Sequence, residues 1–138
     1  MPDVPSAEAI QLPGGRAAPG RARSHVLAQL QGRTSPAAAQ DAALIVSELV
    51  TNSVLHADVG QEQALTLELA TLGDRIRLSV TDAGSSLKPR MLPANRTTPG
   101  GFGLRLVNDM SCAWGVERDG SGRTRVWCEL PLRPVSLP

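Results

Sequence analysis

The chain has 138 residues and a formal net charge of +1, with 41% hydrophobic and 20% charged residues. This length and composition fit one globular domain with a core of its own. Arginines and acidic residues are interspersed, which argues against direct binding of nucleic acid. No apolar run is long enough to span a membrane, and no secretion signal is visible. Two cysteines are too few for a zinc site or a disulfide framework, so we expect a cytoplasmic protein.

The N-terminal part predicts a tail followed by the edge of a sheet. Residues 1–6 are expected to form a flexible tail, and residues 7–138 a single domain. Alternation predicts a short edge strand over 7–12, which stops at Pro13-Gly14-Gly15.

Two helices are predicted next. Apolar spacing predicts the first over about 20–32. Ser35 suits a helix cap and Pro36 a first helical position, so a long second helix is expected from there to Ala57. Its apolar face is predicted to comprise Ala42, Leu44, Ile45, Val46, Leu49, Val50, Val54 and Leu55.

A polar stripe runs beside that apolar face. Glu48, Asn52 and His56 follow one another at steps of four residues, so they lie along one side of the helix. Glu48 is suited to take a proton, and Asn52 to offer its amide oxygen to a hard cation. The alternative is an ordinary amphipathic helix whose stripe is its boundary with water.

The pattern then changes from helical spacing to alternation. Residues 64–71 and 75–81 predict an antiparallel hairpin with one buried face, and residues 113–118 and 123–130 a second hairpin. The sequence therefore predicts an α+β fold, a two-layer sandwich with helices on one face of the sheet.

Two glycine-containing segments lie between the hairpins. Asp82-Ala83-Gly84 ends a strand, where a carboxylate can accept a hydrogen bond from an amine and glycine lets a ring approach. Gly101-Phe102-Gly103 directly precedes a helix that extends to about Asp109, and such a position favours anions. The alternatives are a strand-end turn and a simple helix-entry loop. The irregular segment 84–101 between them suggests a functional loop.

The order of these parts resembles the ATP-binding domain shared by gyrase, histidine kinases and MutL. Within that superfamily the sequence is most similar to the bacterial anti-sigma-factor serine kinases. Three segments support this likeness: Ser47-Glu48-Leu49-Val50-Thr51-Asn52-Ser53-Val54, Ala113-Trp114-Gly115-Val116 and Thr124-Arg125-Val126-Trp127-Cys128-Glu129-Leu130-Pro131. The resemblance implies the histidine-kinase-like ATPase fold, with a mixed, mostly antiparallel sheet.

The resemblance also implies roles for single residues, with ATP and Mg²⁺ as cofactors. Glu48 would be the catalytic general base, and Asn52 would hold Mg²⁺ between the phosphates. Asp82 would pair with the adenine amine, supported by Thr124. Three glycines would complete the site, one giving room for the ring and two receiving the phosphates: Gly84, Gly101 and Gly103.

The family likeness implies protein partners. The chain would bind a sigma factor and phosphorylate a serine on an anti-sigma-factor antagonist protein, and family likeness alone suggests a homodimer. Ser86 stands where the family often has a further glycine, which favours the alternative of a catalytically silent module that sequesters a partner. A stand-alone ATPase is a further alternative. The sequence does not choose a phosphate partner among Lys88, Arg90 and Arg96.

Overall fold

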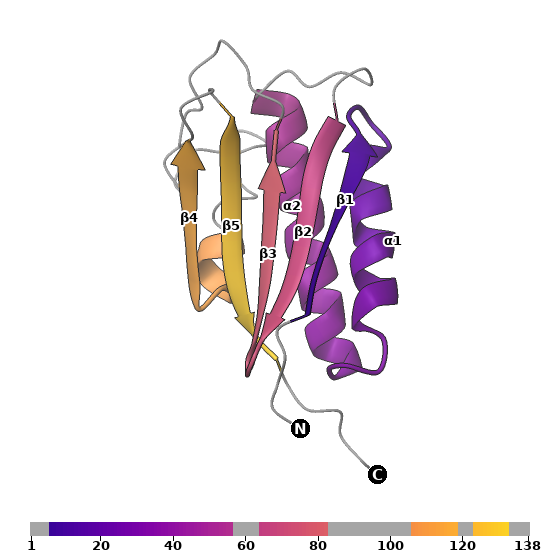
Figure 1. Ribbon diagram of the computed structural model, residues 1–138, viewed down its shortest axis with the longest axis vertical. Helices are drawn as coiled ribbons and strands as arrows, with labels where there is room; N and C mark the ends of the chain where they lie inside the picture. The colour runs from indigo at the N-terminus through magenta and orange to yellow at the C-terminus, as the bar shows by residue number, and fades with distance from the viewer. Residues whose placement is uncertain (1–5, 57–63, 83–105, 119–122, 133–138) are drawn as a thin grey trace.

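The computed structural model describes residues 6–56, 64–82, 106–118 and 123–132. These residues form two layers, a five-stranded sheet and a pair of helices that cover one of its faces (Figure 1). The helices are α1 (Ala18–Leu30) and α2 (Pro36–His56), and residues 106–110 are also helical. The strands are β1 (Ser6–Pro13), β2 (Ala64–Leu72), β3 (Arg75–Thr81), β4 (Ala113–Arg118) and β5 (Thr124–Pro131).

The strands lie in the order β1-β2-β3-β5-β4, and each described pairing is antiparallel. Both predicted hairpins are confirmed, as is the position of the first strand at an edge. The last strand in the sequence, β5, lies inside the sheet between β3 and β4. The predicted two-layer α+β architecture, with a mostly antiparallel sheet, is confirmed.

Both helices start where local chemistry favours a start. α1 begins at Ala18, two residues before the predicted boundary, because Pro19 is compatible with the first turn of a helix. The Oγ of Ser35 accepts a hydrogen bond of 3.2 Å from the N–H of Ala38, which confirms the predicted cap of α2.

The hydrophobic core lies between the helices and the sheet. Leu67 and Leu69 of β2 and Leu78 of β3 alternate with polar residues and point toward the helices, where they are fully or almost fully buried. Most of the predicted apolar face of α2 is buried with them. Leu44 is the most exposed of the described residues of that face, at 40%, because three apolar residues in succession cannot all face one side of a helix.

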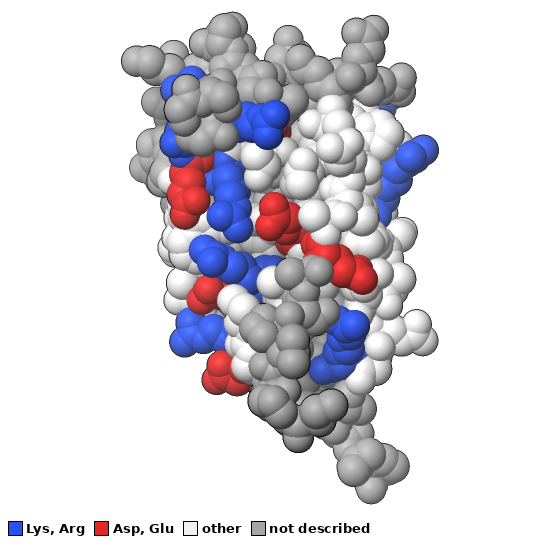
Figure 2. Space-filling view, viewed as in Figure 1, with Lys and Arg blue, Asp and Glu red and all other residues white. Residues whose placement is uncertain are grey.

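The other face of the sheet carries the charged residues. Figure 2 shows side chains of both signs gathered over β3, β5 and β4. The Arg77 guanidinium lies over the Trp127 ring, 4.6 Å from its centroid, so stem and ring cover part of this face.

Among the residues that the structure describes, no helix combines the length and the apolar character needed to cross a membrane.

Candidate functional site

α2 places the two candidate residues of the polar stripe beside the core. Glu48 is half-buried, and Asn52, one turn further along, is only 7% exposed. α2 packs against β3 on the covered face of the sheet. An asparagine at this depth loses its hydrogen bonds to water, which costs free energy unless another partner replaces them.

Three hydroxyl side chains in this part of α2 donate hydrogen bonds to backbone carbonyls of the same helix. Ser47 donates its hydroxyl to the carbonyl of Leu44 at 2.8 Å, and Thr51 donates to Ser47 at 2.7 Å. The Ser53 hydroxyl likewise donates a hydrogen bond to the carbonyl of Leu49. These hydroxyls need no ligand, because a helix carbonyl already accepts their proton.

Asn52 differs from those neighbours. Within the described part of the chain, neither its amide nitrogen nor its amide oxygen has a hydrogen-bond partner. A buried carboxamide without partners in a folded protein calls for an explanation such as a bound ion, water or ligand. Asn52 is therefore the strongest candidate for a ligand contact among the described residues.

The second pair of candidate residues meets between two strands. Asp82 follows β3 and Thr124 begins β5, and each is 6% exposed. The N–H of Asp82 donates to the carbonyl of Thr124 at 3.0 Å, and the N–H of Thr124 donates to Asp82 Oδ1 at 3.3 Å. The backbone of Thr124 thus fixes the carboxylate of Asp82, a contact that the sequence did not reveal. The pairing of Thr81 with Arg125 explains it.

Asp82 lies on the same side of the sheet as α2. It follows Val80, a core residue, by two positions, so strand alternation directs it toward the helix layer. The structure therefore places Glu48 and Asn52 on a helix that packs against the strand leading to Asp82.

The remaining candidates lie outside the described residues. This holds for the three glycines and the three cationic residues: Gly84, Gly101, Gly103, Lys88, Arg90 and Arg96. The helical residues 106–110 after the glycines are described. Val107 is fully buried, and Asn108 Oδ1 accepts a hydrogen bond of 3.0 Å from Trp114 Nε1, which ties this helix to β4.

The described side chains can be compared with the ligands that a hard cation such as Mg²⁺ takes in proteins. No group of three His, Cys, Asp or Glu residues gathers within the described ranges. A site enclosed by protein ligands is thus not found there, whereas Mg²⁺ commonly takes one or two protein oxygens and completes its shell with water and phosphate. The unpartnered amide oxygen of Asn52 fits that second mode.

Comparison with known proteins agrees with this geometry. The model of the family described as the histidine kinase-like ATPase domain matches residues 16–129. The chain belongs to this family. The match spans all of the described candidate residues, from Glu48 on α2 to Thr124 on β5.

Solved structures share the fold of this histidine kinase-like ATPase domain. One contains the RsbU and RsbW domains of Rv1364c from Mycobacterium tuberculosis, with a TM-score of 0.65 and 21% identity, covering 96% of this chain and 34% of that one. Another is the histidine kinase domain of a blue-light activated histidine kinase from Erythrobacter litoralis EL346, with a TM-score of 0.51 and 24% identity; it covers 84% of this chain and 60% of that one. No curated protein matches the sequence. The chain therefore spans about a third of the first structure's chain and three fifths of the second.

Proposed function

We propose that this domain binds Mg-ATP and transfers the terminal phosphoryl group to a serine or threonine of a partner protein, as anti-sigma-factor kinases do. Membership of the histidine kinase-like ATPase family supports ATP as the ligand. The observation that carries the proposal within the chain is the buried carboxamide of Asn52, whose atoms have no hydrogen-bond partner among the described residues.

Six residues would bind and orient the nucleotide. The amide oxygen of Asn52 would coordinate Mg²⁺, which when bound neutralises phosphate charge and holds the phosphates for in-line transfer. Asp82 would accept a hydrogen bond from the adenine amine, held by the N–H of Thr124. The glycines at 84, 101 and 103 would allow the base and the phosphates to come close to the backbone.

Glu48 would act as the general base. Its carboxylate would take the proton of the acceptor hydroxyl while that oxygen forms a bond to the terminal phosphorus. The bond between this phosphorus and the bridging oxygen would break, and ADP would leave with the bond's electrons. The half-buried position of Glu48, one helical turn from Asn52, supports this role.

The partners proposed are a sigma factor and an anti-sigma-factor antagonist whose serine accepts the phosphoryl group. The motif likeness around Glu48 and Asn52, and in the segments that form β4 and β5, supports this choice. The same likeness supports a homodimer.

Titration calorimetry with Mg-ATP tests the binding half of the proposal. Asn52→Ala should weaken binding at least about tenfold, the effect of losing roughly 1.4 kcal/mol of contact free energy. Gln40→Ala is the matched control, because it removes an exposed carboxamide from the same helix and should leave the affinity unchanged. Equal affinity of the wild type and Asn52→Ala would refute the role of Asn52.

Transfer of radiolabelled phosphate from ATP to the antagonist tests the catalytic half. Glu48→Gln should retain nucleotide binding and lose about 100-fold or more of the transfer rate, because the amide cannot accept the proton. Transfer at the wild-type rate would refute the role of Glu48. Tight ATP binding by the wild type without transfer would instead support the silent module that Ser86 favours.

A further inference from the structure

The side of α2 that carries Glu48 continues toward the start of the helix. Asp41 precedes Glu48 by seven residues, which is two helical turns, and Leu44 lies between them, four residues before Glu48. Asp41 is exposed, and so is Leu44, at 40%. This side of α2 therefore presents a carboxylate, an apolar side chain and the proposed catalytic base in succession. We call Asp41, Leu44 and Glu48 the acidic stripe.

The two carboxylates of the acidic stripe have no cation of the protein beside them. α2 contains no lysine or arginine. Within the described part of the chain, the carboxylates of Asp41 and Glu48 make no hydrogen bond or ion pair. Two like charges on one side of a helix repel each other, and a cation from outside relieves this repulsion.

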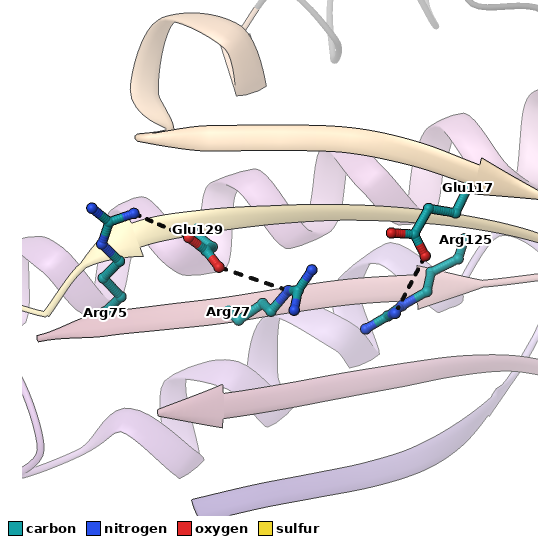
Figure 3. Close-up of polar contacts among 5 residues, drawn as sticks. All are labelled: Arg75, Arg77, Glu117, Arg125 and Glu129. Atoms are coloured by element: carbon teal, nitrogen blue, oxygen red, sulfur yellow. Dashed lines mark hydrogen bonds and ion pairs between the residues drawn. The ribbon is translucent and has the colours of Figure 1, made fainter. Parts of the chain in front are cut away.

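The glutamates on the outer face of the sheet differ from these two carboxylates. Figure 3 shows Glu129 between Arg75 and Arg77, at 3.1 Å and 3.9 Å. It also shows Glu117 beside Arg125, at 3.6 Å. Each of these glutamates has an arginine of a neighbouring strand as its partner. The acidic stripe is therefore the better candidate for an external cation.

A small hollow beside Asp41 suits the side chain of a lysine or arginine. It has a volume of about 130 Å³ and is lined by residues of α2, of the helical segment 106–110 and of the end of β5. Apart from Asp41, the described residues that line it are apolar: Ala38, Met110, Leu130 and Pro131. A long basic side chain can lay its methylene groups against such a surface while its charged end reaches a carboxylate.

The spacing along α2 indicates where a basic residue lies in a bound segment. Asp41 and Glu48 are about 10.5 Å apart along the helix axis, and an extended chain advances about 3.3 Å per residue. A cation at Asp41 and a hydroxyl at Glu48 thus belong to residues three or four positions apart, depending on which way the pleat directs the side chain. Leu44 is about 6 Å from Glu48 along the axis, so it faces a residue two positions from the hydroxyl.

We propose that the acidic stripe binds the segment of the partner protein that carries the acceptor hydroxyl. This segment has a lysine or arginine three or four residues from its serine or threonine, and an apolar side chain between them that contacts Leu44. The basic side chain pairs with Asp41 and brings the hydroxyl to Glu48. Asp41 and Leu44 are thus specificity-determining residues. The inference rests on the proposed phosphoryl transfer, because it takes Glu48 as the base.

Fluorescence anisotropy measures this docking without depending on transfer. The probe is a labelled peptide, Lys-Lys-Leu-Gly-Ser-Gly-Leu-Lys-Lys, which presents the same pattern in both chain directions and is titrated with the full chain, with and without Mg-ADP. Asp41→Lys should weaken binding at least about tenfold, because it replaces an attraction by a repulsion. Position 41 is exposed on α2, so the substitution should leave the fold intact. No binding by the wild type under either condition would overturn the proposal.

Glu8→Lys is the matched control for the change of charge. Glu8 is exposed on β1, three strands from β5, which is about 14 Å across the sheet. This exceeds the Debye length of about 8 Å at physiological ionic strength, so peptide affinity should stay within about twofold of the wild type. An equal loss in Glu8→Lys and Asp41→Lys would overturn the proposal in favour of a nonspecific charge effect.

Leu44→Ala tests the apolar contact. It should weaken binding of the peptide at least about threefold, because it removes apolar surface that the leucine of the peptide covers. Leu72→Ala is its control, since Leu72 is 38% exposed but lies at the end of β2, and it should leave the affinity unchanged. A loss of the same size in both variants would refute a specific contact with Leu44.

Transfer of radiolabelled phosphate separates this docking from the proposed kinase activity. Two further peptides carry Gln or Glu in place of Lys. The wild type should phosphorylate the lysine peptide with a kcat/KM at least about tenfold above that of the glutamine peptide, and Asp41→Lys should prefer the glutamate peptide. Equal kcat/KM for the three peptides would refute the docking and keep the kinase activity. Binding of the lysine peptide that Asp41→Lys abolishes, without transfer to any peptide, would support the docking and count against the kinase activity.

Discussion

Asn52 and Cys128 show how burial affects two polar side chains differently. The Asn52 amide atoms are buried without a hydrogen-bond partner in the described residues, which is a costly arrangement and points to a ligand. Cys128 is buried in the core of β5, where a thiol behaves as a small hydrophobic group. The first residue thus suits binding, and the second suits packing.

Because of Cys128, the stability of the domain should decrease at alkaline pH. Burial raises the pKa of the Cys128 thiol from 9.0 to about 12. The unfolded thiol loses its proton above pH 9.0, whereas the native thiol keeps it. The contribution of the Cys128 thiol to the free energy of unfolding is therefore fully present below pH 9.0, and it is lost as pH rises toward about 12.

Urea unfolding at several pH values checks this dependence. This group should lower the free energy of unfolding by at most about 1.4 kcal/mol for each pH unit above the unfolded pKa. Cys128→Val has no thiol at this position and serves as the control, so its curve should fall less steeply. Parallel curves for the two proteins would contradict the prediction.

At the scale of single elements, the pairing of β5 with β3 and β4 positions residues on both faces of the sheet. On the covered face it brings the Thr124 backbone to Asp82. On the outer face it places Arg125 between Thr81 and Glu117. Successive residues of one strand point to opposite faces, so a single strand contributes to two separate surfaces.

The contact between β4 and β5 requires glycine at position 115. A Cβ built there would lie 2.9 Å from Trp127 Nε1, closer than nonbonded atoms tolerate. Gly115→Ala should therefore destabilise the domain by about 1–3 kcal/mol, the usual range for overpacking. Chemical denaturation measures the loss, and Trp127→Leu in the same chain should recover part of it because the indole is removed.

Gly20→Ala is the control for that substitution. Nothing lies within 4 Å of a Cβ added at Gly20 in α1. Alanine is the better helix former, so this change should stabilise the domain by up to about 1 kcal/mol. A loss of stability as large as that of Gly115→Ala would show that the Trp127 contact is not the cause.

At the scale of the whole molecule, the sheet separates two environments. Its helix side buries Leu67, Leu69 and Leu78 together with α1 and α2, and its other side carries the charged residues (Figures 1 and 2). Among the described elements, the helices pack on one face of the sheet only.

Two leucine substitutions measure how much that core contributes. Leu78→Ala should cost about 2–5 kcal/mol, because Leu78 is fully buried and its removal leaves a cavity. Leu44→Ala should change stability by no more than about 1 kcal/mol, since Leu44 is 40% exposed. Thermal or urea unfolding compares the two, and similar losses would mean that Leu44 is packed in solution.

The sequence by itself determined the elements of this protein. The spacing of apolar residues distinguished α2 from the strands, and Ser35 marked the start of α2 correctly, because these features depend on neighbours within one or two turns. Alternation also identified both hairpins. Glu48 and Asn52 were found as a pair because a step of four residues is a property of any helix. The roles given to them, and to Gly84, Gly101 and Gly103, stay predictions.

Only the tertiary structure decided how these elements meet. The position of β5 beside β3 joins Thr124 to Asp82, and it gathers Arg125 and Glu117 with Glu68 of β2. Which apolar residue is left outside the core, as Leu44 is, was also decided at this level. The physical reason is that pairing between distant strands depends on how the whole core is filled, whereas periodicity within a segment depends only on that segment.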